Sequence, residues 1–428
     1  LCYRTSICIF AAANKWQFNN LTTGMVAPKR KIINDPVYGF ITINHPLIFS
    51  ILAHPYYQRL RRITQMAMGQ LVYPGAVHTR FHHSLGAYHL MGNAVNELRS
   101  KGTEITEEEE IAVKAAILLH DIGHGPYSHA LEHVVVKGVH HEALSLQIMH
   151  EMNAAFDGQL TLAIQIFTGA YHKPFLHQLI SGQLDVDRMD YLSRDSFFCG
   201  VSEGVIGYDR ILKMLVVVDG QLMIEEKGIY SVEKFLVARR QMYWQVYLHK
   251  TVLSAEKMMV KILERARSLY TSTDPAMQTQ SALDYFLGAF TGVMDSFALA
   301  QFCALDDHDI MHAIKRWSAH PDKVLSLLCS RFLTRKLYKT TIQSEPFLAT
   351  TIAAKQKESV DAFELDPSEV DYVCFTGEAT NTLYQTKDER INILFKDGSI
   401  KDISAIDNAL IHQNLSAAVK KNYICQLL

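Results

Sequence analysis

A single predicted helix limits the possible folds more than any other part of the chain. Thr106 is followed three residues later by Glu109, a pattern that caps the start of a helix, and the first turn is rich in acidic side chains. The run 111–119 is apolar on nearly every side, so this helix must be buried. It leads directly into His120 and Asp121. A buried helix that ends in two polar side chains delivers them to an interior cavity, where they need polar partners.

The remainder of the chain is predicted to be helical for most of its length. Helical spacing of apolar residues recurs in four further segments, 84–98, 142–152, 185–195 and 232–269. A loop pattern follows at 271–275, and strand-like segments occur at 372–375 and 382–395, with a turn pattern at 396–399. The sequence therefore predicts a mainly α protein, with one domain over 25–275 and a smaller α+β region over 276–428. Whether that region serves oligomerisation or regulation is left open.

Composition argues against several classes of protein. The 42 basic and 44 acidic side chains give a formal net charge of -2, so no global positive field indicates nucleic-acid binding. Seven cysteines, an odd number without a CxxC pair, argue for a reducing compartment and against a disulfide framework or a thiolate zinc site. No segment approaches the roughly 20 apolar residues that a membrane helix requires. The expected location is the cytoplasm, without a membrane partner.

Residues 1–24 are expected to be an upstream extension without a folded role. The run 7–13 has the apolar character of a truncated signal sequence. A natural start at Met25, in the segment Met25-Val26-Ala27-Pro28-Lys29, is the favoured interpretation, since the given chain begins with Leu.

Histidine is concentrated in one part of the chain. Ten of the 20 histidines lie between His78 and His141, and imidazole is both the commonest metal ligand and a proton carrier near neutral pH. Four side chains offer a mixed nitrogen and oxygen ligand set: His83, His120, Asp121 and Asp187. Such a set suits one divalent transition metal (Mn, Fe, Ni, Co or Zn) rather than Ca, and it leaves positions for water and a phosphate oxygen.

Further polar side chains lie close to this set in the sequence. His124 follows His120 by one helical turn and would be one ligand too many, so it is a better proton donor or phosphate partner. His141 and Glu142 open the next helix and resemble an orienting pair of imidazole and carboxylate. Four other histidines are expected to be structural or exposed: His82, His89, His133 and His140. A lone His-Asp pair is a weak signal, but the ordered combination at a buried helix end favours a functional site.

The longer motifs resemble the HD superfamily and, within it, the deoxynucleoside triphosphate triphosphohydrolases, including bacterial members. The resemblance runs from about residue 31 to residue 250 and is carried by Ile33-Asn34-Asp35-Pro36, 57–63, 74–76, Arg80-Phe81-His82-His83-Ser84-Leu85-Gly86, His120–His129 and Asp185–Asp195. It implies an HD-type helical bundle core, a nucleotide substrate and a homo-oligomer, either a dimer or a tetramer. No SAM domain, which some members carry, is evident in the sequence.

The resemblance implies a role for each matching side chain. The metal would be held by His83, His120, Asp121 and Asp187. Hydrolysis would be assisted by His124, His141 and Glu142. The substrate would contact Arg80, Arg188, Arg239 and His129 through its phosphates, Tyr191 and Asp195 through its sugar, and Gln65 and Tyr247 at the nucleoside. Tyr247 would crowd the 2′ position and so favour deoxyribose, because an aromatic ring gives a tight wall.

Some positions depart from the pattern of the animal enzymes. Arg188 stands where they have Lys, Tyr243 where they have His, and Leu248 where they have Gln. The last two lie near the expected nucleoside, so these departures concern the preference for a base and leave the hydrolytic residues unchanged. The residues of a nucleotide-activator site, Asn34, Asp35 and Arg61, are present. The resemblance therefore implies activation by a guanine nucleotide.

The sequence as a whole predicts a metal-dependent phosphohydrolase. The predicted reaction converts a deoxynucleoside triphosphate into a deoxynucleoside and inorganic triphosphate, with Mg accompanying the nucleotide. One alternative is a phosphatase or phosphodiesterase on another nucleotide, such as a monophosphate or an alarmone. Three arginines weigh against it, because three cations suit three phosphates. A nucleotide-sensing scaffold without turnover is the other alternative, and the intact ligand set weighs against it.

Overall fold

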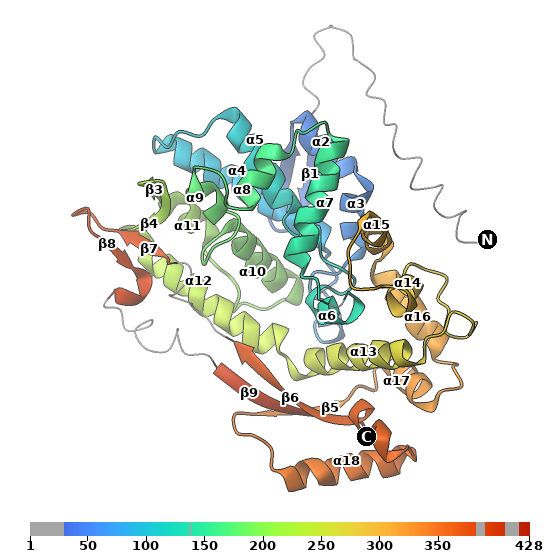
Figure 1. The fold of residues 1–428 in the computed structure, drawn as a ribbon. Helices are drawn as coiled ribbons and strands as arrows, with labels where there is room; N and C mark the ends of the chain where they lie inside the picture. Colours follow the sequence, from blue (N-terminus) through green and yellow to red (C-terminus); the bar gives the residue numbers. More distant parts are fainter. Residues whose placement is uncertain (1–29, 137, 382–389, 407–418) are drawn as a thin grey trace.

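The computed structural model describes residues 30–136, 138–381, 390–406 and 419–428. Helices form most of this structure, which confirms the mainly α prediction, and a smaller region with both strands and helices follows near the end of the chain. Figure 1 shows a bundle of helices with small sheets at its periphery. The expected extension over 1–24 lies outside the described residues.

The helices before residue 243 are α2 (Pro46–Ala53), α3 (Pro55–Gln58), α4 (Arg80–Ser100), α5 (Glu107–Leu119), α6 (Glu132–Val135), α7 (His141–Ala155), α8 (Thr161–Phe167), α9 (Pro174–Gln178), α10 (Val186–Cys199), α11 (Tyr208–Met214) and α12 (Ile229–Met242). They are followed by α13 (Lys250–Leu269), α14 (Leu283–Gly288), α15 (Ser296–Ala304), α16 (Asp307–Trp317), α17 (Lys323–Leu333) and α18 (Ala349–Phe363). Two single 3-10 turns matter for the site, η3 (Arg59–Arg62) and η5 (Ser128–Ala130).

Helix α5 lies in the interior, as its sequence predicts. The hydroxyl of Thr106 accepts a hydrogen bond from the Glu109 N–H at 3.1 Å, and the Glu109 carboxylate accepts one from the Thr106 N–H at 2.8 Å. Ile117, Leu118 and Leu119 are fully buried, and the helix packs against α4 and α8. Its last turn therefore delivers the next two side chains to the interior.

A glycine allows α4 and α10 to approach each other closely. A Cβ atom added at Gly86 on α4 would lie 1.9 Å from Oδ1 of Asp190 and 2.1 Å from Nη2 of Arg194, both on α10. Any larger residue would push the two helices apart. This close contact brings the side chains at the start of α4 next to those at the start of α10.

The predicted continuous helix over 232–269 is wrong, because a wide turn divides it. The segment η7 (Tyr243–Tyr247) is π-helical, with the N–H of Leu248 donating to the carbonyl of Tyr243 at 2.8 Å. The His249 ring then caps α13 by accepting a bond from the Thr251 N–H at 3.2 Å. The turn carries Tyr247, whose hydroxyl reaches α10. Such π-turns often occur at functional sites, and here the turn places an aromatic side chain in the site described below.

Within the described residues, three small sheets accompany the helices. They are the hairpin of β1 (Lys31–Asp35) and β2 (Gly39–Ile43), the sheet β3-β4-β7-β8 of β3 (Leu215–Val218), β4 (Gln221–Glu225), β7 (Asn392–Leu394) and β8 (Ile400–Asp402), and the sheet β5-β9-β6 of β5 (Lys339–Gln343), β6 (Cys374–Asn381) and β9 (Val419–Gln426). Among the strands of the described residues, β4 and β7 pair in parallel and the other pairs are antiparallel. The C-terminal region thus adds two strands to a hairpin of the helical region, whereas α18 and the β5-β9-β6 sheet lie beyond α13 (Figure 1).

The two strand segments predicted near the end of the chain, 372–375 and 382–395, do not pair with each other in the described residues. β6 pairs with β9, and β7 pairs with β8 across the predicted turn, where the Phe395 N–H donates to the Ser399 carbonyl at 2.9 Å. Residues 382–389 of the second predicted segment lie outside the described residues.

None of the described helices combines the length and the apolar character needed to cross a bilayer. The cysteines in the described part of the chain are free thiols.

Candidate metal centre and active site

Three helices bring the four predicted metal ligands together. His83 comes from α4, His120 and Asp121 from the end of α5, and Asp187 from α10. The Nε2 atom of His83 lies 3.0 Å from Oδ1 of Asp187 and 3.5 Å from Oδ2 of Asp121. The Nε2 atom of His120 lies 3.4 Å from Oδ1 of each carboxylate. Because metal bonds to such atoms are about 2.1 Å long, neighbouring ligands lie roughly 3 Å apart. We call these four residues the metal centre.

The chemistry of this donor set fits a divalent ion. The Nδ1 atom of His83 contacts Oδ2 of Asp190 at 2.7 Å, and the Nδ1 atom of His120 contacts the Ile117 carbonyl at 2.6 Å. Both Nε2 atoms are buried and have no hydrogen-bond partner among the described residues. Metal-binding histidines characteristically anchor one ring nitrogen in this way and present the other to the ion. The centre therefore has the arrangement of a site for one divalent cation.

Electrostatics in the metal centre favour ionised carboxylates. Burial would raise the pKa of Asp187, but the imidazoles of His120 and His83 outweigh it and hold that pKa well below its usual range. Burial also opposes ionisation of Asp121, and its pKa is held well below the usual value by the charges of His120 and Arg80. The pKa of His83 rises to about 10 despite burial, because two carboxylates face its ring. A divalent ion would supply the positive charge that protons supply otherwise.

A second group of imidazoles lies beside the metal centre. The ring centroids of His124 and His141 are 4.1 Å apart, and His129 lies 4.8 Å from the first and 5.0 Å from the second. These three side chains also have ligand atoms within 4.8 Å of one another. Burial and the nearby Arg80 guanidinium hold the pKa of His124 well below its usual value. We call these three residues the second histidine cluster.

The carboxylate that orients this cluster is Glu132, and the prediction of His141 and Glu142 as an orienting pair is wrong. Oε1 of Glu132 contacts Nδ1 of His141 at 2.7 Å and accepts the His141 backbone N–H at 2.9 Å, while Oε2 contacts Nδ1 of His129 at 3.1 Å. These contacts hold the pKa of Glu132 well below its usual range, against the effect of burial. Glu142 is exposed. Consecutive residues of a helix point in different directions, so Glu142 cannot follow the His141 side chain inward.

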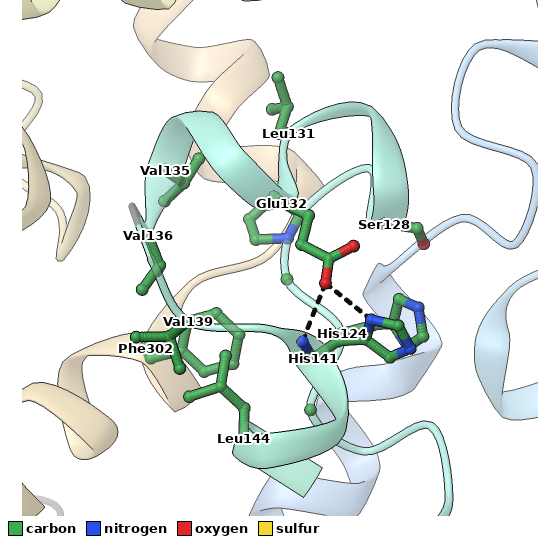
Figure 2. Close-up of a pocket in the computed structure, with 13 residues that line it drawn as sticks. His124, Ser128, Leu131, Glu132, Val135, Val136, Val139, His141, Leu144 and Phe302 are labelled. Carbon is green, nitrogen blue, oxygen red and sulfur yellow. Dashed lines mark hydrogen bonds and ion pairs between the residues drawn. The ribbon is translucent and has the colours of Figure 1, made fainter. Parts of the chain in front are cut away.

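A small cavity adjoins the second histidine cluster. Its volume is about 20 Å³, enough for one water molecule. Figure 2 shows that one side is polar, with His124, His141 and Glu132, and that the other side is formed by apolar side chains. The apolar lining consists of Leu131, Val135, Val136, Val139, Leu144 and Phe302. Glu132 thus stands between an apolar wall and the imidazoles that it orients.

The three predicted phosphate-binding arginines have different partners. The Arg80 guanidinium is buried, bonds the Ser128 hydroxyl at 2.7 Å and pairs with Asp121. Arg188 donates from Nε to the Gly182 carbonyl at 2.6 Å, and Arg239 donates from Nη1 to Oε1 of Gln183 at 3.3 Å. The last two bonds involve adjacent residues of one loop. This loop leads into α10, so both cations are fixed close to the helix that bears Asp187.

The predicted nucleoside end lies at the other end of α10. The Tyr247 hydroxyl donates to Oδ2 of Asp195 at 2.7 Å, and the rings of Tyr191 and Tyr247 are 6.4 Å apart. The side-chain oxygen of Gln65 is buried and has no hydrogen-bond partner among the described residues. Of the departing positions, Tyr243 donates from its hydroxyl to the Thr380 carbonyl at 3.3 Å.

The predicted activator residues are not equally accessible. Asp35 is buried, and its carboxylate pairs with Arg194 at 2.8 Å and accepts the Val37 N–H at 3.0 Å. Asn34 and Arg61 are exposed. The Asp35 oxygens are therefore engaged within the chain, and an activator would rely on the other two.

The histidines expected to be structural or exposed have the following positions. His82 completes the capping box of α4, where its Nδ1 accepts the Thr79 N–H at 3.1 Å. His89 stacks on Tyr38 at 5.3 Å, and the His140 side chain is 74% exposed. The side chain of His133 lies outside the described set.

Several residues of the site were not singled out by the sequence analysis. Asp190 and Glu132 orient histidines of the two clusters, as described above. Arg59 is 1% exposed and donates to the carbonyls of Ile122 and His124 at 2.8 Å and 2.9 Å, and to that of Leu305 at 3.2 Å. It ties the loop after α5 to the C-terminal part of the chain. Only the Asp190 position, inside a matched motif and on the same helix as Asp187, could have been found from the sequence.

Asp307 makes a second connection between the C-terminal part and the active-site loop. Its Oδ1 accepts the Tyr127 N–H at 2.7 Å, and its Oδ2 accepts both the backbone N–H and the hydroxyl of Thr64 at 2.8 Å. Tyr127 has a φ of 53°, in the left-handed region. A non-glycine residue needs local support in this conformation, and Asp307 supplies it one residue before Ser128.

Comparisons with known proteins agree with this geometry. Residues 80–195 match the family model described as HD domain, and residues 206–287 match the HD associated region. The uncharacterized protein YwfO of Bacillus subtilis is 31% identical over 390 residues, which cover 88% of this chain and 87% of the relative. A deoxynucleoside triphosphate triphosphohydrolase SAMHD1 homolog of Dictyostelium discoideum is 31% identical over 278 residues, which cover 60% of this chain and 54% of that protein. The match therefore spans about half of the Dictyostelium relative.

Other relatives extend the match and include a solved structure. The SAMHD1 enzyme of Bos taurus is 26% identical over 450 residues, covering 93% of this chain and 72% of the enzyme. A crystal structure titled as a phosphohydrolase from Bacteroides thetaiotaomicron has a TM-score of 0.87 and 48% identity, covering 93% of this chain and 100% of that chain. With its histidine and aspartate residues arranged as described, this chain belongs to the HD superfamily of phosphohydrolases.

Proposed function

We propose that the protein hydrolyses deoxynucleoside triphosphates to deoxynucleoside and inorganic triphosphate. The observation that carries the proposal is the convergence, in the metal centre, of two imidazole nitrogens that make no hydrogen bond within the described residues and two carboxylates whose pKa values are held low. Relatives named as deoxynucleoside triphosphate triphosphohydrolases support the substrate class. Water attacks the α-phosphorus, a new phosphorus–oxygen bond forms, and the bond to the 5′ oxygen of the nucleoside breaks.

The residues of the metal centre would hold one divalent transition metal (Mn, Fe, Ni, Co or Zn). When bound, such an ion polarises the reacting phosphoryl oxygen. Asp190 keeps the His83 ring oriented through its 2.7 Å contact with Nδ1. Arg188 and Arg239 bind the phosphate chain, as the forked guanidinium matches phosphate oxygens. Arg80 is held at the metal centre by Ser128 and Asp121. Mg accompanies the nucleotide.

The second histidine cluster supplies the proton for the leaving group. Glu132 contacts Nδ1 of His141 at 2.7 Å, which orients the ring and leaves Nε2 for the substrate. His141 therefore holds a proton for the departing 5′ oxygen. His124 and His129 face the phosphates from the same side. Glu142, which the resemblance places among the catalytic residues, is exposed.

Sugar selectivity and activation are also part of the proposal. Tyr247 and Tyr191 enclose the sugar, and Tyr247 excludes a 2′ hydroxyl. A guanine nucleotide would bind through Asn34 and Arg61, both exposed, in a homo-oligomer. Measuring turnover and oligomeric state with and without GTP tests this part separately.

The decisive experiment removes one carboxylate from the metal centre. In Asp121→Ala, both metal content and turnover of a mixture of deoxynucleoside triphosphates, supplied with Mn, are expected to collapse. Asp209→Ala, a change at an exposed carboxylate, is the matched control. Products are separated as triphosphate, pyrophosphate and phosphate, and release of pyrophosphate or phosphate alone would replace the proposed reaction by another phosphohydrolase activity. An active Asp121→Ala variant that keeps its metal would end the assignment.

A further inference from the structure

A buried chain of hydrogen bonds lies behind the predicted nucleoside end of the site. His78 precedes α4, Asp195 is on α10, and Tyr247 is in η7. The Nε2 atom of His78 is 2.6 Å from Oδ1 of Asp195, and the Tyr247 hydroxyl is 2.7 Å from Oδ2. His78 and Asp195 are 1% and 2% exposed. Each oxygen of the Asp195 carboxylate is therefore held by a protein group, Oδ1 by His78 and Oδ2 by Tyr247.

The surroundings of His78 determine the direction of these bonds. Its Nδ1 atom is buried and has no hydrogen-bond partner among the described residues. A proton on Nδ1 would be buried without an acceptor, which is costly. The ring therefore carries its N–H at Nε2 and donates it to Asp195. Tyr247 donates to the other oxygen and keeps its proton, because burial and Asp195 raise its pKa well above the usual value.

His78 is connected to three of the four residues predicted at the sugar and the nucleoside. Its backbone carbonyl accepts the N–H of Gln65 at 3.1 Å. Its ring holds Asp195 directly and Tyr247 through Asp195. The ring itself stacks on Phe198, with centroids 4.5 Å apart and an interplanar angle of 20°. Because its ring is almost fully buried behind Asp195, we assign it no contact with substrate.

We propose that His78 is a positioning residue that sets sugar selectivity, by fixing Asp195 and through it the ring of Tyr247. This inference rests on the proposed function. Tyr247 is half-buried and lies on a π-turn, so its hydroxyl bond to Asp195 is what fixes the ring as a wall. If Asp195 loses the His78 bond, the carboxylate can rotate and the Tyr247 ring can retreat. A ribonucleotide with its 2′ hydroxyl would then fit.

The test compares variants that separate hydrogen bonding from packing. His78→Phe keeps an aromatic ring against Phe198 but removes the donor. His78→Gln offers an amide N–H at a similar reach and serves as the rescue. Phe198→Leu weakens the stacking and keeps the donor. For each protein, kcat and KM are measured for a deoxynucleoside triphosphate and its ribonucleoside counterpart, together with metal content.

The expected result is a change in selectivity without loss of the metal. In His78→Phe, the ratio of kcat/KM for the deoxy over the ribo substrate should fall roughly ten- to hundred-fold, the weight of a hydrogen bond to a charged group. His78→Gln should recover most of the ratio, and Phe198→Leu should keep it. An unchanged ratio in a folded, metal-replete His78→Phe would overturn the inference. An equal loss in Phe198→Leu, or no recovery in His78→Gln, would overturn it too, since packing would then explain the effect.

Two further measurements keep the outcomes distinct. If His78→Phe does not fold, Tyr247→Phe, which removes the hydroxyl bond at the other oxygen of Asp195, must lower the ratio similarly, and an unchanged ratio refutes the inference. If the wild-type protein hydrolyses neither substrate, the proposed function fails. The selectivity is then measured as the ratio of Kd values for non-hydrolysable deoxy and ribo triphosphates. Equal Kd ratios in the wild-type protein and the variants would refute the role of His78 independently.

Discussion

The metal centre and the second histidine cluster hold their imidazoles in different ways. In the metal centre, His83 and His120 are buried and come from long helices. In the second histidine cluster, the His129 side chain is 67% exposed and lies on the short turn η5. His141 depends on Glu132, which comes from the four-residue helix α6. The first group is rigid before any ligand arrives, whereas the second depends on a loop. We therefore expect metal retention and turnover to respond to different mutations.

The largest effect should follow from a change inside the metal centre. In Asp187→Asn, one ionised ligand facing both His83 and His120 becomes neutral. Metal content should fall close to zero, and turnover should fall by about 10³-fold or more, since the electrostatic stabilisation is lost with the ion. Elemental analysis of the purified protein and a triphosphate-release assay check this. A variant that retains a full equivalent of metal would contradict the assignment of Asp187.

The second histidine cluster should show the opposite behaviour. In Glu132→Gln, His141 and His129 lose the carboxylate at Nδ1. Turnover should fall about 10²-fold, the lower range for a positioned general acid, while metal content stays at the wild-type level. Glu142→Gln is the informative comparison, because the resemblance implies a loss there and the contacts imply none. If Glu142→Gln reduces kcat as much as Glu132→Gln does, the orienting role of Glu132 is wrong.

A weaker effect on the metal centre is expected from the residue behind His83. Asp190→Asn keeps the shape of the side chain but removes the charge that contacts Nδ1 of His83 at 2.7 Å. Changes to such a partner typically reduce metal affinity by about 10- to 100-fold. Metal titration into the stripped protein measures the shift. If Asp190→Asn instead lowers turnover while metal affinity stays unchanged, Asp190 does not support the metal centre and this prediction is wrong.

The same comparison explains which parts of the site could be predicted from the sequence. The metal centre was predictable because its signals are local: the capping box and apolar run of α5 lead directly into His120 and Asp121, and these features persist in the folded helix. The order of His83, the His-Asp pair and Asp187 along the chain supplied the rest. The structure brings all four of these side chains together.

The support of the second histidine cluster was not predictable, because it depends on contacts between distant parts of the chain. Arg59 donates a hydrogen bond to the carbonyl of Leu305, and no local sequence pattern around either residue predicts this contact. Glu132 was missed because Glu142 is adjacent to His141 in sequence, although it points elsewhere in the helix. The division between α12 and α13 was missed for a similar reason, since apolar spacing does not reveal a π-turn.

The smallest effect on turnover is expected at Asp307, which supports the loop of the second histidine cluster from α16. Asp307→Asn removes a charged acceptor from the N–H groups of Tyr127 and Thr64. At pH 7.5, turnover should fall about tenfold, the weight of one hydrogen bond to a charged group, with metal content unchanged. A loss of metal would mean that the loop supports both groups equally.

The pH dependence of stability tests the same residue independently. Burial raises the pKa of Asp307 from 3.8 to about 6, although three hydrogen bonds oppose the shift. The folded protein therefore holds this proton more strongly than the unfolded chain does. As pH rises from about 4 to about 6, the stability of the wild-type protein relative to Asp307→Asn should fall, by up to about 3 kcal/mol, and then remain level. Denaturant unfolding at several pH values measures this difference. If the stability of the wild-type protein relative to Asp307→Asn instead rises with pH, the ionised form of Asp307 stabilises the fold. The expected fall means that the ionised carboxylate orders the active-site loop at a cost in stability.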